Sequence, residues 1–440
     1  MERAKKKKAI LLGAISPFCD LVREMADLNI EPIICDYYSD APAKKMSYPS
    51  YEISTTDVDA VLALAKKEEV DGVVCAFSDR NLMPAHQICE ALHLNHFFSE
   101  ETIDVLTDKE KMKRFFRENG CPVVNYGLIS FESADWDKAI EAFRFPVITK
   151  PIDAYGSKGI YLCETAEEVR RVSQSVIKES LHHKGSMIVE EYYLADEISI
   201  SAWVKNGRAY ITCVYDVFRN IEGSFTLSAV AFPSKYTEKE LDRFDALVNQ
   251  VVSDMSIEEG PVTLQCFIGP SGIKLSELLC RLAGGSPYAY PTYFGGPDTA
   301  KMLIAYSVGD PIDYQNLTEF KPVLPPEEVI YHIQVIVNRK GKIRFDFDRQ
   351  RIMEEDPGFA DLVVYYSDGD ELVNVGSSGV IFARIMYRTR RDADFNELAE
   401  KLDKLVCAYG EDGVKSSFIR RAQRINVTDT YEIDWAFLKG

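Results

Sequence analysis

Disulfide and metal-binding patterns are missing from this chain of 440 residues. It has no C-x-x-C pair, and its ten cysteines stand singly, several of them inside apolar runs that resemble strands: Cys35, Cys75, Cys163, Cys213 and Cys266. This spacing indicates reduced thiols in a core rather than a disulfide framework or a zinc site. The six histidines show no metal-ligand spacing, since His182 and His183 are adjacent and neighbouring positions cannot share one helix face.

Positive charge and long apolar runs are also scarce. Lys and Arg number 51 against 69 Asp and Glu, and the resulting net charge of −18 disfavours nucleic acid or an anionic membrane as a partner. The basic run Lys5 to Lys8 is followed only by Ala9 to Leu12, which is too short for a signal peptide or a membrane span. We therefore expect a cytoplasmic protein with no nucleic-acid partner and no membrane partner.

Enough apolar sequence is present, at 46% hydrophobic residues, for two to four domains. Residues 8 to 97 alternate short apolar runs with amphipathic ones, a βαβαβ pattern that predicts a parallel sheet. The first turn, residues 13 to 17, lacks G-x-G-x-x-G, which argues against a dinucleotide on this domain. Asp36 and residues 78 to 80 stand at predicted carboxyl ends of strands, where open α/β sheets bind ligands, although such residues are also ordinary turn formers.

The pattern changes after about the first hundred residues. A helix is predicted from Asp108 through Glu118, and the later strands are joined by tight turns, which indicates an antiparallel sheet. Three prolines between Pro322 and Pro326 mark a connection to a small β-rich region. We predict three parts: an α/β domain over 1–103, a central domain over 104–320 with a small lid at about 120–187 and a larger sheet over 188–320, and an α+β domain over 321–440.

The stretch from Phe145 to Gly159 is typical of a clamp for phosphate groups. An apolar strand ends at Lys150, and a glycine-containing turn with a second ammonium, Lys158, follows at residues 156 to 159. A strand-borne ammonium is a fixed charge, and a glycine turn lets backbone N–H groups approach phosphate oxygens closely. A solvated loop has the same sequence features, so the residues downstream must decide between the two interpretations.

Carboxylates after the next strand suit adenosine recognition, because Glu190 and Glu197 could accept from an adenine amino group and from ribose hydroxyls. A predicted hairpin then carries Gln265 on one strand and Glu277 on the next, with Arg281 four residues beyond. Oxygen ligands on facing strands suit Mg²⁺ bound to a nucleotide, and an arginine can neutralise a phosphoryl group in transfer. Each set alone fits an acidic hinge or a cross-strand pair equally well, but their order along the chain favours a nucleotide site.

In this order the motifs resemble the ATP-grasp superfamily, in its carbamoyl-phosphate-synthase-like and biotin-carboxylase-like branch, over about residues 8 to 310. The matching segments are 107–109, 145–151, 156–159, 189–191 with Glu197, Gln265, 277–281 and 284–285. The resemblance implies an ATP-grasp fold of mixed α/β and α+β class. A Rossmann-like parallel-sheet domain would come first, then ATP-binding subdomains, then a small β-rich domain similar to the lid of carboxylase-type and amino-acid-ligase-type members.

The resemblance also assigns roles. ATP and Mg²⁺ are the implied cofactors, and Mn²⁺ is an acceptable substitute for Mg²⁺. The residues implied to contact ATP are Lys109, Lys150, Tyr155, Gly156, Ser157, Lys158, Gly159, Glu190, Glu191, Tyr193 and Glu197. Gln265 and Glu277 would hold the metal, while Arg281 and Lys150 would stabilise the transferring phosphoryl group. One position departs from the family pattern, because Leu279 stands where the family commonly has a second metal-ligating asparagine, and a leucine cannot coordinate magnesium.

The implied reaction is ATP-dependent carboxylate–amine ligation on small molecules, with release of ADP and phosphate. Two alternatives stay open: bicarbonate activation of the biotin-carboxylase kind, although no Ala-Met-Lys-Met acceptor is present, and an ATP-binding sensor or scaffold without turnover, motivated by Leu279. Family members are often dimers, so a homodimer is compatible with the resemblance. The candidate substrate contacts, each also explained as a structural or solvated residue, are Asp79, Arg80, Asp216, Arg219, Gly285, Tyr288 and Tyr293.

Overall fold

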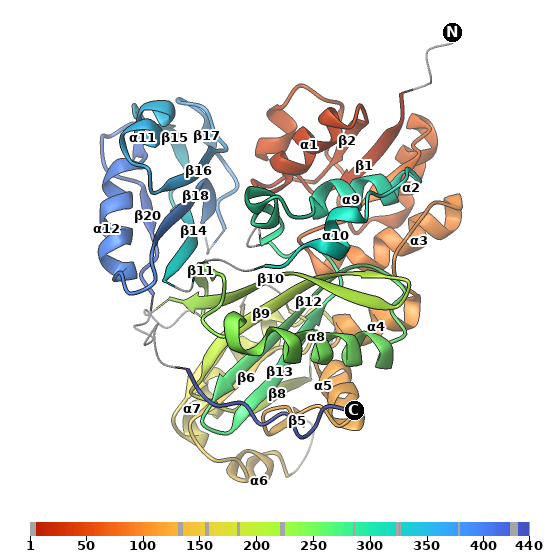
Figure 1. The fold of residues 1–440 in the computed structure, drawn as a ribbon, viewed down its shortest axis with the longest axis vertical. Coiled ribbons are helices and arrows are strands. Elements are labelled where there is room, and N and C mark those ends of the chain that lie inside the picture. The colour runs from red at the N-terminus through yellow and green to blue at the C-terminus, as the bar shows by residue number, and fades with distance from the viewer. Residues whose placement is uncertain are drawn as a thin grey trace.

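The computed structural model describes residues 6–130, 135–154, 158–182, 185–220, 225–284, 287–322, 325, 327–376, 379–422 and 430–439. Within these ranges the chain forms a four-stranded parallel sheet, antiparallel sheets of four and nine strands, and a small three-stranded sheet, with helices packed on their faces (Figure 1). No helix in this part of the chain is long and apolar enough to cross a membrane.

The N-terminal domain has the predicted parallel sheet. Its strands, in the order β3-β2-β1-β4, are β1 (Lys8–Leu12), β2 (Glu31–Cys35), β3 (Ser50–Tyr51) and β4 (Gly72–Val74). Helices α1 (Phe18–Asp27), α2 (Val58–Glu68) and α3 (Leu82–Leu92) and the short η1 (Pro42–Lys45) and η2 (Asp79–Asn81) complete it. Successive residues of β1 enter opposite cores, since Leu11 packs in the cluster that contains α1 and Leu12 in the one that contains α2. This burial on both faces explains the continuous apolar run.

A four-stranded antiparallel sheet, the lid sheet, follows two helices, α4 (Glu100–Thr107) and α5 (Lys109–Glu118). Within the described residues its strands, in the order β5-β8-β6-β7, are β5 (Tyr126–Ser130), β8 (Ser186–Glu191), β6 (Val147–Lys150) and β7 (Tyr161–Cys163), with helices α6 (Trp136–Glu141) and α7 (Ala166–Glu179). The predicted boundary between residues 187 and 188 is wrong, because β8 pairs with both β5 and β6. The lid therefore extends to Glu191.

The large sheet joins the central region to the C-terminal region. In the described part of the chain its order is β13-β12-β9-β10-β11-β14-β18-β16, with β20 beside β14. These strands are β9 (Asp196–Lys205), β10 (Arg208–Arg219), β11 (Leu227–Phe232), β12 (Glu259–Gly269), β13 (Gly272–Leu279), β14 (Glu328–Val337), β16 (Phe359–Val364), β18 (Val380–Arg390) and β20 (Ser417–Ile419). Because β11 pairs with β14, the predicted division at residue 320 separates strands of one sheet.

The remaining elements are helices that pack on this sheet or on the first domain, and short strands of the C-terminal domain. Helix α8 (Thr237–Asp254) packs on β10 and β9, and α9 (Thr299–Ser307) returns to pack on α1 and β4 of the first domain. The other elements are η3 (Pro287–Ala289), η4 (Pro291–Phe294), α10 (Gln315–Glu319), β15 (Gly341–Arg344), α11 (Arg349–Glu355), β17 (Glu371–Leu372), α12 (Phe395–Leu405) and β19 (Tyr409–Gly410). All ten cysteines are free thiols, and most are buried, as predicted for core thiols.

Candidate functional site

In strands β9, β12 and β13 of the large sheet, one face carries polar side chains and the opposite face packs into a hydrophobic core. In β9, β12 and β13 the side chains of Ile200, Leu264 and Leu278 enter the hydrophobic cluster under α8. Because strand side chains alternate, their neighbours Ser199, Gln265 and Glu277 belong to the other face, where the register places them directly opposite one another. The predicted hairpin thus forms, and Gln265 and Glu277 are a cross-strand pair. Two oxygen-bearing side chains so close together could share one hard cation.

Two lysines share one buried carboxylate where α5 meets the lid sheet. Glu190 on β8 lies 2.7 Å from the ammonium of Lys150 on β6 and 3.0 Å from that of Lys113 on α5. All three side chains are at most 8% exposed. Sequence reasoning assigned Glu190 to an adenine amino group, but in the structure its carboxylate is engaged by two ammonium groups. That assignment stays a prediction, and the ion pairs give Glu190 a structural task in addition.

Burial and the neighbouring charges together set the pKa values of these three groups. Burial opposes ionisation of Glu190, but the two lysines outweigh it and lower the pKa of the carboxyl to about 2. Burial also lowers the pKa of Lys113, whereas for Lys150 the nearby Glu190 and Glu277 outweigh burial and raise the pKa. One carboxylate does not compensate two buried ammonium groups, so the pair of lysines retains positive charge.

Lys109 reaches the same region from the start of α5. The Asp108 side chain caps this helix by accepting from the backbone N–H groups of Glu110 and Lys111, which fixes Lys109 as the first helical residue. The Lys109 ammonium donates to the carbonyl of Ala154 at 2.7 Å and lies 3.8 Å from the Glu277 carboxylate. The cap thus holds an ammonium beside the polar face of the large sheet.

Besides the three lysines, two arginines lie in this region, and each is paired with a carboxylate. Arg281 makes two hydrogen bonds to Asp79, from Nε at 2.8 Å and from Nη2 at 2.6 Å, and so ties the end of β13 to the loop after β4. Arg219 at the end of β10 binds both oxygens of Glu197. The planar fork of arginine favours such bidentate contacts. The candidate substrate residues Asp79 and Arg219 and the ribose candidate Glu197 therefore already have protein partners.

Glu277 is the electrostatic centre of this arrangement. Its charge acts on Lys113, Lys150, Arg219 and Arg281, and it lies near Lys109. These five cations are accompanied by four carboxylates, those of Asp79, Glu190, Glu197 and Glu277. We call these nine residues the lysine–carboxylate site. The chain as a whole has a net charge of −18, whereas this site has a local surplus of positive charge and is therefore suited to binding an anion.

The other predicted site residues have different surroundings. Lys158 is exposed, and Gly159 has φ +68°, with Pro151 so close that an added Cβ would meet its Cγ at 2.9 Å. Glu191 accepts from Asn125 and from the backbone of Arg144. Tyr155, Gly156, Ser157 and Gly285 lie outside the described residues.

Several residues that were predicted to contact ATP or substrate form hydrogen bonds with other protein groups. The Tyr193 hydroxyl donates to the Gly272 carbonyl at 2.7 Å. Asp216 accepts from the Ser234 hydroxyl and the Lys235 backbone, and burial raises its pKa to about 6. Tyr288 donates to Asp20, while Arg80 and Tyr293 are exposed.

Lys113 is the site residue that sequence reasoning missed. A signal was available, because Lys113 follows Lys109 by four positions on a predicted helix and such positions share one helix face.

Leu279 lies on the same face of β13 as Glu277, opposite Thr263, and is 7% exposed. No oxygen ligand is therefore available from this side chain beside Glu277.

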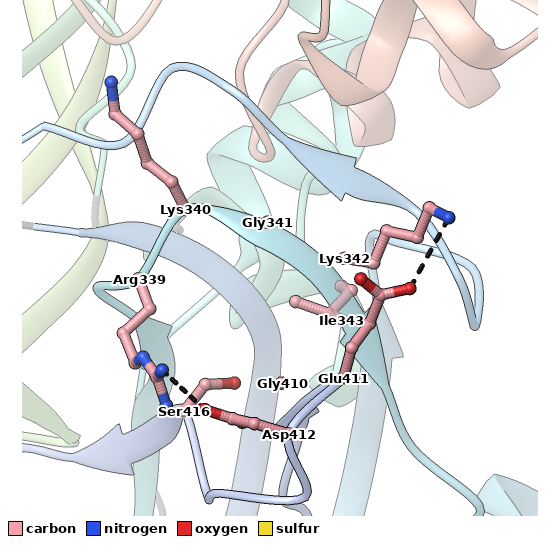
Figure 2. A pocket seen from close by; sticks show the side chains of 9 residues that line it. All are labelled: Arg339, Lys340, Gly341, Lys342, Ile343, Gly410, Glu411, Asp412 and Ser416. Carbon is pink, nitrogen blue, oxygen red and sulfur yellow. Dashed lines mark hydrogen bonds and ion pairs between the residues drawn. The ribbon is translucent and has the colours of Figure 1, made fainter.

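A separate hollow of about 230 Å³ lies on the C-terminal domain between the turn before β15 and residues 410–416 (Figure 2). Its charged side chains are paired with one another, Arg339 with Asp412 at 2.9 Å and Lys342 with Glu411 at 3.5 Å. None of the residues of the lysine–carboxylate site lines it. We therefore take the lysine–carboxylate site, and not this hollow, as the candidate functional site.

Fold and site together define a mixed α/β protein in which cations gather where a small antiparallel sheet meets a larger one. Residues 143–286 match the family model of the ATP-grasp domain. Over this segment the chain is similar to ATP-grasp domains, in agreement with the resemblance that the sequence motifs indicated.

One curated relative and two solved structures illustrate the similarity. The chain is 25% identical over 197 residues to a formate-dependent phosphoribosylglycinamide formyltransferase of Pasteurella multocida, a match that covers 44% of this chain and 49% of that enzyme. It thus spans about half the length of that relative. The biotin carboxylase domain of Hydrogenobacter thermophilus 2-oxoglutarate carboxylase has TM-score 0.75 at 15% identity, over 94% of this chain and 91% of that one. An L-amino acid ligase of Bacillus licheniformis has TM-score 0.68 at 15% identity, over 92% and 98%. The two solved structures show a shared fold.

Proposed function

We propose that the protein is an ATP-dependent ligase that phosphorylates a small-molecule carboxylate and joins it to an amine, with release of ADP and phosphate. The observation that carries the proposal is the position of Glu277 among five cations, beside Gln265. A nucleoside triphosphate with a bound cation matches this charge pattern, because lysines and arginines bind phosphate oxygens and the paired oxygen ligands can bind the cation. The names of the relatives add weight, since they include a formate-dependent enzyme and an amino acid ligase.

The side chains support this chemistry in defined ways. Lys109 and Lys150 would hold the phosphates, and Arg281 would neutralise the γ-phosphoryl group as its bond to ADP breaks and its bond to the carboxylate oxygen forms. The amine nitrogen would then attack the acyl carbon, lose a proton, and displace phosphate. Phosphorylation is needed because the oxygen of a free carboxylate is a poor leaving group.

The oxygen donors present fit a magnesium ion, which would neutralise charge on the phosphates when bound. Gln265 and Glu277 would supply protein ligands, with nucleotide oxygens and water completing the six that Mg²⁺ prefers. Leu279 supplies none, so we expect the site to bind the ion weakly and to need a higher Mg²⁺ concentration.

An acid screen with hydroxylamine tests the ligase proposal without knowledge of the natural amine. Hydroxylamine attacks acyl phosphates and gives hydroxamates, which form coloured complexes with iron(III), so ADP release and hydroxamate should rise together with the correct acid. We expect Lys150→Met to reduce that rate by about 100-fold or more. ADP release that no acid stimulates would contradict the proposal, and stimulation by bicarbonate without hydroxamate would favour carboxylase-type activation.

The Leu279→Asn variant separates a weak metal site from a site without turnover. The added amide oxygen should lower the Mg²⁺ concentration for half-maximal ADP release by about tenfold. Leu279→Met, which has a similar volume and no oxygen, is the control and should behave as the original protein. Tight ATP binding without turnover in both the original protein and Leu279→Asn would instead favour the nucleotide sensor.

We further propose a cytoplasmic location and a homodimeric state. Free cysteines are what a reducing compartment maintains, and ten of them occur here without a disulfide. The biotin carboxylase domain of the H. thermophilus enzyme was solved as a dimer. Light scattering on the purified protein measures the oligomeric state directly.

A further inference from the structure

Two histidines that are ten positions apart lie side by side on the N-terminal domain, outside the lysine–carboxylate site. His86 is on α3, and His96 follows the end of this helix. Their Nδ1 atoms are 3.4 Å apart, and the rings stand edge to face with centroids 4.7 Å apart. His93 brings them together, because it ends α3 in the left-handed conformation and lets the chain fold back, with the Leu94 N–H bonded to the Cys89 carbonyl.

Glu90 determines which nitrogen of His96 is free to bind a ligand. Its carboxylate oxygen is 2.5 Å from His96 Nε2, and since an ionised carboxylate only accepts, that nitrogen carries the proton. In the neutral ring the Nδ1 atom of His96 then has a lone pair, and His86 Nδ1 lies 3.4 Å from this atom. A carboxylate that holds the far nitrogen of an imidazole is the usual partner of a metal-binding histidine, because it fixes the ring and raises its basicity.

The distances between the donor atoms suit one small ion. Zinc–nitrogen bonds of about 2.0–2.1 Å in tetrahedral geometry place two ligand atoms about 3.3–3.4 Å apart. His86 Nδ1 and His96 Nδ1 are separated by 3.4 Å, and the Phe98 carbonyl oxygen lies 3.3 Å from His96 Nδ1. Ligand atoms of His86, Glu90 and His96 all lie within 4.8 Å of one another. Both histidines are half-buried and Glu90 is exposed, so the rings are held in place and an ion can enter from solvent.

We propose that His86 and His96 bind a divalent ion of the zinc class through their Nδ1 atoms, with Glu90 as the carboxylate that orients His96. The Phe98 carbonyl or water would complete the coordination. Imidazole nitrogens select Zn²⁺, Ni²⁺ or Cu²⁺ over Mg²⁺, so this site and the nucleotide site take different metals. The ion would connect α3 to the segment that leads into α4, and would stabilise the chain reversal at His93.

Zinc titration by calorimetry, without nucleotide, tests the proposal on the full chain. We expect one zinc ion to bind with a micromolar or lower Kd, and His86→Gln or His96→Gln to weaken it about tenfold or more. Glu90→Gln should weaken it less, by up to about tenfold, because a carboxylate that orients a ligand is lost rather than a ligand. His93→Asn is the matched control, since it removes an exposed histidine of the same segment and asparagine accepts the left-handed conformation.

A second measurement locates the ion. Crystals soaked in zinc should give an anomalous peak between His86 and His96. Binding that is equal in the original protein and in the double variant His86→Gln/His96→Gln, or a peak only elsewhere, such as at cysteines, would overturn the proposal. The two histidines would then form only a hydrogen bond, from Nδ1–H of His86 to Nδ1 of His96. Because nucleotide is absent from these experiments, neither result depends on the proposed ligase activity.

Discussion

Glu190 shows how a single residue can hold a charged site together. Replacing it with glutamine would leave the ammonium groups of Lys113 and Lys150 buried without the anion that pairs with them directly, which typically costs about 3–5 kcal/mol. We expect Glu190→Gln to lower the free energy of unfolding by about that amount, measured by urea denaturation. Glu191→Gln on the same strand is the control, because its glutamine keeps an acceptor oxygen for Asn125, and it should change stability by less than about 1 kcal/mol. Equal effects of the two variants would contradict this account.

Asp216 gives a pH dependence of known sign. Burial raises its pKa from 3.8 to about 6, so the native state binds the proton more tightly than the unfolded chain does. Its contribution to stability is therefore fully present below pH 3.8 and is lost as the pH rises through about 6. Asp216→Asn does not titrate and keeps an acceptor for the Ser234 hydroxyl. Between pH 4 and pH 7 the variant should gain about 2–3 kcal/mol relative to the original protein, by urea denaturation at each pH. A difference that stays constant over this range would contradict the assignment.

Sequence reasoning identified many of the residues that gather at the site but not how they are paired. Lys109, Lys150, Glu277 and Arg281 were chosen from local motifs, and the structure brings them into one region. The pairing of Glu190 with Lys113 was not foreseen, since it depends on how α5 packs on the lid sheet. The histidine pair was missed for a related reason, because its closeness depends on the chain reversal after α3.

At the scale of elements, the cap of α5 links helix stability to the site. Asp108→Ala removes the side chain that binds the N–H groups of Glu110 and Lys111, and should reduce stability by about 1 kcal/mol. It should also weaken ATP binding about tenfold, because the ammonium of Lys109, the next residue, loses its fixed position. Calorimetry with ATP and Mg²⁺ measures this change.

Asp298→Ala is the matched control for the cap of α5. Asp298 caps α9 in the same way, by accepting from the Lys301 N–H, but α9 packs on the first domain. A similar loss of stability with unchanged ATP affinity is expected. If both variants bind ATP equally well, the cap has no role in the site.

Elements with strong local signals were predicted and the others were not. The helix from Asp108 had a cap and an apolar stripe, and the hairpin that carries Gln265 and Glu277 had a glycine-containing turn between apolar strands. By contrast β16 and β20 were not foreseen, because short edge strands without clear turns have little local signal and depend on pairing with β18 and β14.

At the scale of the whole molecule, Arg384 connects the first and last domains. From β18 it donates to Asp20 of α1 at 2.6 Å and to Asp361 of β16 at 2.8 Å. Its side chain is 7% exposed, so Arg384→Met would remove the buried cation that Asp20 and Asp361 share, leaving Asp20 with Arg23 at 2.9 Å and Asp361 with Arg349 at 3.7 Å. We expect a loss of about 3–5 kcal/mol in the free energy of unfolding, measured by urea denaturation.

Arg388 on the same strand provides the comparison. It is 48% exposed and pairs with Glu328, so Arg388→Met should change stability by less than about 1 kcal/mol. Separate unfolding transitions of the two domains in Arg384→Met, in place of one, would show directly that the arginine couples them. A variant as stable as Arg388→Met would show that the bridge contributes little.

The sequence by itself determined the local structure and the chemistry of single positions. Alternating apolar runs specified the parallel sheet, caps and turns specified helices and hairpins, and the order of lysines, carboxylates and arginine indicated a phosphate-binding site. Only the tertiary structure decided which strands are neighbours, as in the place of β8 in the lid and the pairing of β11 with β14. The physical reason is that local signals act over a few residues. Strand pairing, buried ion pairs and the closeness of His86 to His96 arise only when distant segments pack together and exclude water.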